Sequence, residues 1–285
     1  FIRLWDLQGH LLKRFGLPNI AFFSVNFSPD GQTLVVAGDD GNSYLWNLQG
    51  QLLAKFKGNQ ESVLSVIFSP DGQRLISAGS DGTTKIWSRS GLELATLRGH
   101  QEAVFSVAMT GDGKILATAS EDGTVKLWDL TPKTTVGSRL ATARLTGFAF
   151  NPVQSEIAIT TPEEPPKLFN LQGQLQRTFP AQGQDFSSLG LAQLSFSADG
   201  QYLMGNAGGG NIQIWDRQGK LISHFQAAMG RIYDLQMNPD NTVIAVANRQ
   251  GEIWLWQWQN HQQSPRLLRK IKADSDRLRS LSFNP

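Results

Sequence analysis

Residues 99–129 read GHQEAVFSVAMTGDGKILATASEDGTVKLWD, and this stretch decides the fold. Large apolar and small residues alternate from Val104 to Met109, which is typical of a β-strand. The turn dipeptides Asp112-Gly113 and Asp122-Gly123 separate this run from two further short runs, the last of which ends in Trp128-Asp129. Asp-Gly between such runs is a strong signal for a tight turn between antiparallel strands. The stretch therefore predicts a meander of short antiparallel strands.

The same pattern recurs along the whole chain with a period of about 41 residues. An aromatic residue after Leu or Ile marks each repeat, at Trp5, Trp46, Trp87, Trp128, Phe169, Trp215 and Trp256. A second landmark, Phe-Ser-Pro-Asp-Gly in its full form, starts at Phe27, Phe68, Met109, Phe150, Phe196, Met237 and Phe283. Four short strands in each repeat are typical of one propeller blade. We therefore expect an all-β fold, a seven-bladed β-propeller of four-stranded antiparallel blades, in one domain over residues 1–285.

The repeats place the blades at about 8–47, 48–88, 89–129, 130–170, 171–216 and 217–257, with the seventh formed by 258–285 together with 1–7. If the strands of a blade are lettered a to d from the ring centre outward, the sequence begins in a strand c and ends after a strand a at Leu278–Phe283. The seventh blade then lacks one interior strand, the counterpart of Asp71–Gly82. Because unpaired strand edges inside a sheet are costly, we expect the polypeptide to extend beyond one or both ends.

Composition limits the classes of function. The net charge is +2, below the basic excess of dedicated nucleic-acid-binding proteins. The absence of Cys excludes disulfides and Cys-ligated zinc. No apolar run approaches the ~18 residues of a membrane span. The four His stand at different repeat positions, which does not suggest a metal cluster. We expect no cofactor, no nucleic-acid or membrane partner, and a cytoplasmic location.

The repeat that holds Gly99-His100, Thr118, Asp122 and Trp128-Asp129 resembles the WD-repeat family of β-propellers, and the resemblance extends over the whole chain. It implies that His100, Thr118, Asp122 and Trp128 form a hydrogen-bonded tetrad that ties a turn to the strand below it. The same resemblance assigns His100 a structural role and argues against a catalytic reading of His100, Asp122 and Thr118.

Other repeats depart from this pattern. Asn59 replaces the His in the repeat with Ser77, Asp81 and Trp87, and tetrad positions elsewhere hold Val36, Glu163, Gly209 and Gln250. Most blades must therefore be held by apolar packing and by hydrogen bonds within the sheet. Residues 163–166 read Glu-Glu-Pro-Pro before a third strand. Because Pro cannot donate to a strand ladder, we expect distorted pairing there.

The resemblance also implies a top face, formed by the loops that join strands d to a and b to c, which most often binds peptides. The residues at the exposed positions of that face form two groups in this sequence. One is an apolar group with polar neighbours: Phe23, Asp39, Leu64, Ser80, Phe105 and Glu121. The other is an arginine-rich group: Arg144, Arg231, Tyr233, Arg249, Arg277 and Arg279. Aromatic residues and Arg are enriched at binding hot spots, and Arg pairs bidentately with carboxylate and phosphate. A peptide with an apolar anchor and an acidic or phosphorylated stretch suits both groups. The alternative is that the arginines are solvated rim residues.

Two insertions of five residues interrupt the period, at 181–186 in a top-face loop and near 260–265 in a turn on the opposite face. Loops carry function more often than strands, although short polar insertions are usually neutral. Trp254, Trp256 and Trp258 alternate along one strand. Trp256 is in register with the repeat, so we expect Trp254 and Trp258 to share its face in the core between blades.

These observations favour a non-catalytic scaffold, not an enzyme, that binds a protein or peptide partner on its top face. Two alternatives stay open: nucleic-acid or phospho-ligand binding through the arginine-rich group, and a hydrolase at the channel mouth, although no catalytic motif is present. The segments 48–53 and 171–175 resemble repeats of large bacterial, especially cyanobacterial, multidomain WD-repeat proteins. That resemblance implies a monomeric propeller that serves as the sensor or docking part of a longer chain, without ATPase activity of its own.

Overall fold

The computed structural model describes residues 1–59, 61–131, 137–139 (backbone only), 146–161, 164–180, 193–206, 208–259, 264–273 and 278–285. Contacts between residues divide the chain into two compact units. One unit is Phe1–Thr142 with Asn284–Pro285, and the other is Ala143–Phe283. The two units are described in turn below.

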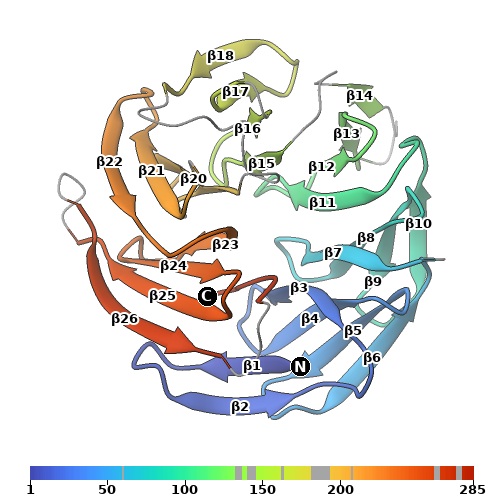
Figure 1. Ribbon diagram of the computed structural model, residues 1–285. Helices are drawn as coiled ribbons and strands as arrows, with labels where there is room; N and C mark the ends of the chain where they lie inside the picture. Colours follow the sequence, from blue (N-terminus) through green and yellow to red (C-terminus); the bar gives the residue numbers. More distant parts are fainter. Residues whose placement is uncertain are drawn as a thin grey trace. The chain divides into compact units, whose positions relative to one another are not determined.

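The first unit begins with a two-stranded antiparallel sheet of β1 (Ile2–Trp5) and β2 (Leu11–Phe15). Three four-stranded antiparallel sheets follow in chain order (Figure 1). The first of these consists of β3 (Phe22–Phe27), β4 (Thr33–Gly38), β5 (Asn42–Asn47) and β6 (Leu52–Lys57). The second consists of β7 (Val63–Phe68), β8 (Arg74–Gly79), β9 (Thr84–Ser88) and β10 (Glu93–Leu97). The third consists of β11 (Val104–Met109), β12 (Ile115–Ser120), β13 (Val125–Asp129) and β14 (Gly137–Arg139).

The second unit contains three further four-stranded antiparallel sheets. The first consists of β15 (Gly147–Phe150), β16 (Glu156–Thr160), β17 (Lys167–Asn170) and β18 (Leu175–Thr178). The second consists of β19 (Leu194–Phe196), β20 (Tyr202–Asn206), β21 (Asn211–Asp216) and β22 (Leu221–Gln226). The third consists of β23 (Ile232–Met237), β24 (Val243–Asn248), β25 (Glu252–Gln257) and β26 (Arg266–Lys272). Each sheet is a meander in which consecutive strands pair.

The Asp-Gly turns between strands form because both residues stabilise them. The Asp112 carboxylate accepts hydrogen bonds from the Thr110 hydroxyl at 2.6 Å and from the Lys114 amide at 3.1 Å. Gly113 has a φ of 68°, a conformation that disfavours any side chain. The same arrangement joins β3 to β4, where the Asp30 carboxylate accepts from the Ser28 hydroxyl. The repeated sequence landmark is therefore a repeated turn.

Each four-stranded sheet draws on two consecutive sequence repeats. The sheet β3–β6, for example, extends over Phe22–Lys57, so its outer strand β6 comes after the Trp46 that ends one repeat. The landmark aromatic residue packs between neighbouring sheets: the ring of Trp87 on β9 lies 6.0 Å from that of Phe56 on β6. Buried side chains of both sheets surround this pair, among them Val35, Leu45, Val66 and Leu75.

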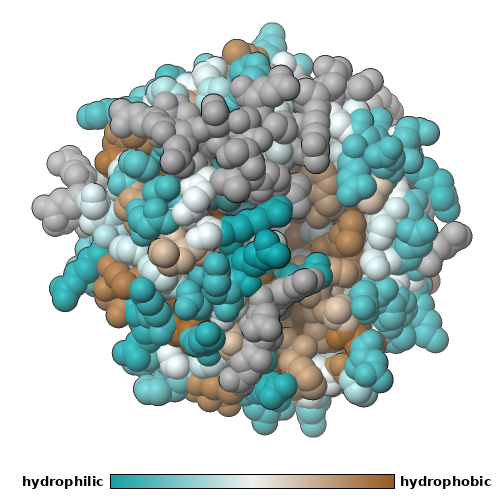
Figure 2. Space-filling view, in the orientation of Figure 1, coloured by the Kyte–Doolittle hydropathy of each residue, from teal (hydrophilic) through white to brown (hydrophobic). Residues whose placement is uncertain are grey.

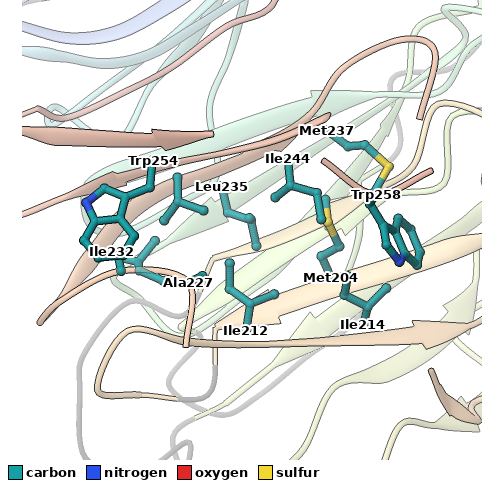
Figure 3. Packing of buried hydrophobic residues seen from close by; sticks show 12 residues of the cluster. Met204, Ile212, Ile214, Ala227, Ile232, Leu235, Met237, Ile244, Trp254 and Trp258 are labelled. Atoms are coloured by element: carbon teal, nitrogen blue, oxygen red, sulfur yellow. The ribbon is translucent and has the colours of Figure 1, made fainter. Parts of the chain in front are cut away.

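The largest cluster of buried residues in the second unit lies between the sheets β19–β22 and β23–β26 (Figure 3). Met204, Ile212 and Ile214 of the first sheet meet Leu235 and Ile244 of the second. Trp254 and Trp258 are 6% and 1% exposed in this cluster, and Trp256 packs against it. The expectation that these tryptophans belong to the core between blades is therefore confirmed.

The expected fold class, an all-β propeller of four-stranded antiparallel sheets, is confirmed for six blades. A seventh four-stranded blade is not found among the described residues. There, β1 pairs with β2 alone, and residues 278–283 have no strand assignment because no described strand forms a ladder with them. Pairing before the third strand at Lys167 is shortened but keeps its register. The ladder between β16 and β17 ends at Ile159–Lys167, so Pro166 is not paired, whereas in the sheet β7–β10 the equivalent pair Ala78–Thr84 is present.

Among the residues that the structure describes, no helix has the length and the apolar character that a membrane span requires.

Candidate functional site

The innermost strands of the three four-stranded sheets in the first unit share one irregularity. In β3, Phe22 pairs with Gly38 and Ser24 with Ala37, so Phe23 is the extra residue of a register shift in this ladder. The register of β7 and of β11 shifts in the same way, which makes Leu64 and Phe105 the extra residues there. Such β-bulges change the direction of a side chain relative to a regular ladder. All three apolar candidates from the sequence therefore occupy the same bulge.

The three bulged strands are neighbours. β7 lies between β3 and β11 (Figure 1), and hydrogen bonds cross from β3 to β7. The Asn26 amide donates to the Val66 carbonyl at 3.1 Å, and the Val66 amide donates to the Ser24 hydroxyl at 3.4 Å. Phe23, Leu64 and Phe105 are half-buried, and Figure 2 shows hydrophobic surface over β7. The structure thus gathers the apolar group within one unit.

The innermost strand β23 of the second unit has the same bulge. Ile232 pairs with Asn248 and Asp234 with Ala247, which leaves Tyr233 as the extra residue. The Arg231 guanidinium lies over the Tyr233 ring, with its Cζ atom 5.6 Å from the ring centroid. Arg231 Nε is buried and has no hydrogen-bond partner among the described residues. A buried guanidinium nitrogen without an acceptor is costly, and an anionic ligand would remove that cost.

The remaining members of the arginine-rich group are placed as follows. The Arg249 amide donates to the Arg231 carbonyl at 2.9 Å, so both lie where β23 begins and β24 ends, and the Arg249 side chain is exposed. Arg279 is also exposed and belongs to the same unit. Arg144 and Arg277 lie outside the described residues. The structure therefore brings Arg231, Tyr233 and Arg249 together.

Asp234, next to Tyr233, was not singled out from the sequence. Its carboxylate accepts hydrogen bonds from the Leu281 amide at 2.6 Å and from the Leu235 amide at 2.8 Å. Burial raises the pKa of Asp234 to about 6, although these hydrogen bonds act to lower it. The bond to Leu281 places residues 278–283 beside β23, and with them Arg279.

The four side chains of the expected tetrad form a continuous chain of hydrogen bonds in the sheet β11–β14. Trp128 Nε1 donates to the Thr118 hydroxyl at 2.9 Å, Thr118 Oγ1 lies 2.7 Å from His100 Nε2, and His100 Nδ1 lies 2.8 Å from an Asp122 carboxylate oxygen. Burial lowers the pKa of His100, which favours the neutral ring. Burial alone would raise the pKa of Asp122, but hydrogen bonds from Thr124, His100 and Gln101 lower it to about 2. The polar atoms of these four side chains thereby have hydrogen-bond partners within the sheet and its adjoining turns.

The sheet β7–β10 builds an analogous chain with an amide. Trp87 Nε1 donates to the Ser77 hydroxyl at 2.9 Å, the Ser77 hydroxyl donates to Asn59 Oδ1 at 3.1 Å, and Asn59 Nδ2 donates to Asp81 at 3.3 Å. Asn59 therefore takes the place of His100, because it bridges Ser77 and Asp81, which are the counterparts of Thr118 and Asp122. In the sheet β3–β6, Val36 stands at the position of Ser77, and Trp46 Nε1 has no partner among the described residues.

Other residues of the types found in metal sites do not cluster in the part of the chain that the structure describes. There, no group of three or more His, Asp or Glu side chains could hold a metal ion. The inserted loop residues 181–186 lie outside the described residues, as does His261.

Comparison with known proteins gives two results. Residues 7–47, 50–88 and 91–129 match the family described as WD domain, G-beta repeat. An uncharacterized WD repeat-containing protein of the cyanobacterium Synechocystis is 38% identical over 128 residues, a match that covers 43% of this chain and 10% of that protein. The resemblance to WD-repeat proteins is thereby confirmed for three repeats, and this chain spans only a small part of the length of its relative.

Proposed function

From these WD repeats we propose that the chain is a non-catalytic platform that binds a protein or peptide partner at the bulges of its innermost strands. The observation that carries this proposal is the recurrence of one β-bulge in four sheets, each time with a large side chain as the extra residue: Phe23, Leu64, Phe105 and Tyr233. A bulge interrupts the hydrogen bonds of a ladder, so its recurrence at the same position in four sheets calls for an explanation. The explanation we propose is that each bulge presents its extra side chain to the partner.

The residue types support the same proposal. Aromatic side chains and Arg are enriched in the central contacts of protein interfaces, because they bury a large area while also offering polar contacts. The half-buried Phe23, Leu64 and Phe105 supply apolar contacts in the first unit. Arg231 and Tyr233 supply a cation and an aromatic ring in the second unit. We propose that the partner carries apolar side chains for the first group and acidic or phosphorylated ones for the second.

The role within a longer protein is part of this proposal. The Synechocystis relative is about ten times as long as the matched segment, which supports a propeller that serves as one part of a multidomain protein. In such a protein, a binding platform would act as the sensor or docking part, in the cytoplasm and as a single propeller per chain.

The proposal can be tested by affinity capture from the organism that encodes the chain, followed by quantitative mass spectrometry. Wild type is compared with the double variant Phe105→Ala/Leu64→Ala and with the double variant Arg231→Glu/Tyr233→Ala. The control is Lys220→Glu, which reverses an exposed charge in the turn between β21 and β22. We expect one set of proteins to be lost at least tenfold from both double variants and retained by the control. Equal capture by all four proteins, each shown to be folded by circular dichroism, would contradict the proposal.

A further inference from the structure

Asp234 stands where the repeats of the first unit have a serine. Its counterparts there, at intervals of one repeat, are Ser24, Ser65 and Ser106. In the sheet β3–β6, the Ser24 hydroxyl accepts a hydrogen bond from the Val66 amide of the next innermost strand at 3.4 Å. This contact joins neighbouring blades by a neutral acceptor at a long distance. The repeat that holds β23 therefore replaces a neutral acceptor by a carboxyl group.

Leu281 is the repeat counterpart of Val66, so the contact between Asp234 and Leu281 is the same contact in another blade. It is shorter, at 2.6 Å, and its acceptor is a carboxylate oxygen. The side chains of Ser280 and Gln236 also hydrogen-bond to this carboxyl group. These contacts attach residues 278–283 to β23. Hydrogen bonds to a charged acceptor are about twice as strong as neutral ones.

The attachment decides where Arg279 stands. Arg279 is the counterpart of Leu64, and Tyr233 is the counterpart of Phe23. Since Asp234 and Leu281 meet as Ser24 and Val66 do, Arg279 has the same register relative to Tyr233 as Leu64 has relative to Phe23. Arg231 already lies over the Tyr233 ring. This register places a second guanidinium group on the segment beside Tyr233, and the carboxylate of the adjacent Asp234 offsets part of the repulsion between the two guanidinium groups.

We propose that Asp234 is a positioning residue, which holds residues 278–283 against β23 and so unites Arg279, Arg231 and Tyr233 into one surface that binds a phosphate or carboxylate group of the partner. The proposal rests on the proposed function and names the chemistry of the partner at this blade. The buried Arg231 Nε without a described acceptor supplies an independent indication of an anionic ligand. Phosphate and carboxylate each offer two oxygens that the planar guanidinium group can bind bidentately.

The first experiment measures the attachment without any ligand. Amide hydrogen exchange of Leu281 is followed by NMR in wild type, in Asp234→Ala and in Asp234→Asn, whose side-chain oxygen can still accept the bond. We expect protection of Leu281 to fall at least tenfold in Asp234→Ala and to be largely restored in Asp234→Asn. The control Ser24→Ala removes the equivalent contact in the first unit and leaves Leu281 unchanged. Unchanged protection in Asp234→Ala would overturn the positioning role.

The second experiment measures anion binding with inorganic phosphate as the probe, observed through the Nε–H signals of Arg231 and Arg279. In wild type we expect both signals to shift with one dissociation constant. In Asp234→Ala, Arg279 stops responding while Arg231 still shifts with an affinity at least threefold weaker, a split that loss of the fold would not produce. If both arginines respond together in Asp234→Ala, the positioning role is wrong. If neither responds in wild type, the anion site is wrong, and the outcome of the capture experiment decides the proposed function separately.

Discussion

The sheets β3–β6 and β11–β14 each bury a tryptophan at the same repeat position, but through different interactions. Trp128 in β11–β14 donates its indole hydrogen to Thr118 and packs against Leu97, an aliphatic side chain of the preceding sheet. Trp46 in β3–β6 has no described acceptor, because Val36 takes the place of Thr118, but its ring lies 5.3 Å from that of Phe15. Both tryptophans are buried, at 7% and 4% exposure. A blade of this fold can therefore be completed without its hydrogen-bonded chain.

The sheet β7–β10 combines both means. Trp87 donates to Ser77 and also packs against Phe56. The three sheets show that aromatic packing and the hydrogen-bonded chain can occur separately or together around the landmark tryptophan. It also shows where substitutions will cost most, since a buried polar chain is expensive to leave half complete but can be absent altogether.

The largest effect is expected when the polar chain of β11–β14 is broken in the middle. Thr118→Val keeps the shape of the side chain but leaves the indole nitrogen of Trp128 and one ring nitrogen of His100 without partners. We expect the free energy of unfolding to fall by about 3 kcal/mol, measured by urea denaturation. The control is Thr84→Val, because Thr84 is equally buried but its hydroxyl has no partner among the described residues. Equal losses in both variants would show that the chain itself contributes nothing.

The reverse substitution in β3–β6 is expected to have a smaller and opposite effect. Val36→Thr places a hydroxyl where Ser77 and Thr118 stand in the other two sheets, within reach of the Trp46 indole nitrogen. We expect the free energy of unfolding to rise by about 1 kcal/mol. The gain should vanish in a Trp46→Phe background, which has no indole donor. A gain that persists in that background would assign the effect to packing.

A third effect is expected from pH, and it sharpens the comparison through two carboxyl groups. The pKa of Asp122, at the end of the chain in β11–β14, is lowered to about 2 from its ordinary 3.8. Its contribution to stability is therefore present above about pH 4 and lost as the pH falls toward 2. The pKa of Asp234 is raised to about 6, so its contribution is present below about pH 4 and lost as the pH rises through 6.

Urea denaturation between pH 2 and pH 8 tests both signs. Asp122→Asn should weaken the pH dependence on the acid side, which it shares with other carboxyl groups of lowered pKa such as Asp71, and Asp234→Asn should remove the decline between about pH 4 and pH 6. A loss of stability on acidification that Asp234→Asn abolishes would contradict the assignment of a raised pKa to that residue.

Much of this comparison could be predicted from the repeat positions. Val36 stands one repeat before Ser77 and two repeats before Thr118, which already indicates that β3–β6 lacks its polar chain, and the alternating tryptophans Trp254 and Trp258 indicate a core position. The four-stranded meander follows from short alternating runs and Asp-Gly turns. These features depend on residue type and spacing alone, which is why the sequence is sufficient for them.

The bulges and the role of Asp234 could not be predicted in the same way. A register shift depends on the hydrogen bonds between two strands, and the residues around Phe23, Leu64 and Phe105 look like regular alternation. Asn59 bridges Ser77 and Asp81 only because the backbone brings all three within 3.3 Å, which no residue spacing reveals. Arg144 and Arg277 stay predictions, because they lie outside the described residues.

The sheets and the sequence repeats are out of phase, since every outer strand comes from the repeat after the one that supplies its three inner strands. The repeat bounded by its landmark aromatic residue is therefore not the four-stranded sheet that folds. A whole repeat can be gained or lost at any point of the period and still leave each strand with a suitable neighbour. The same offset means that melting one repeat removes the outer strand of the sheet before it, so within each compact unit the sheets should unfold together and not one by one.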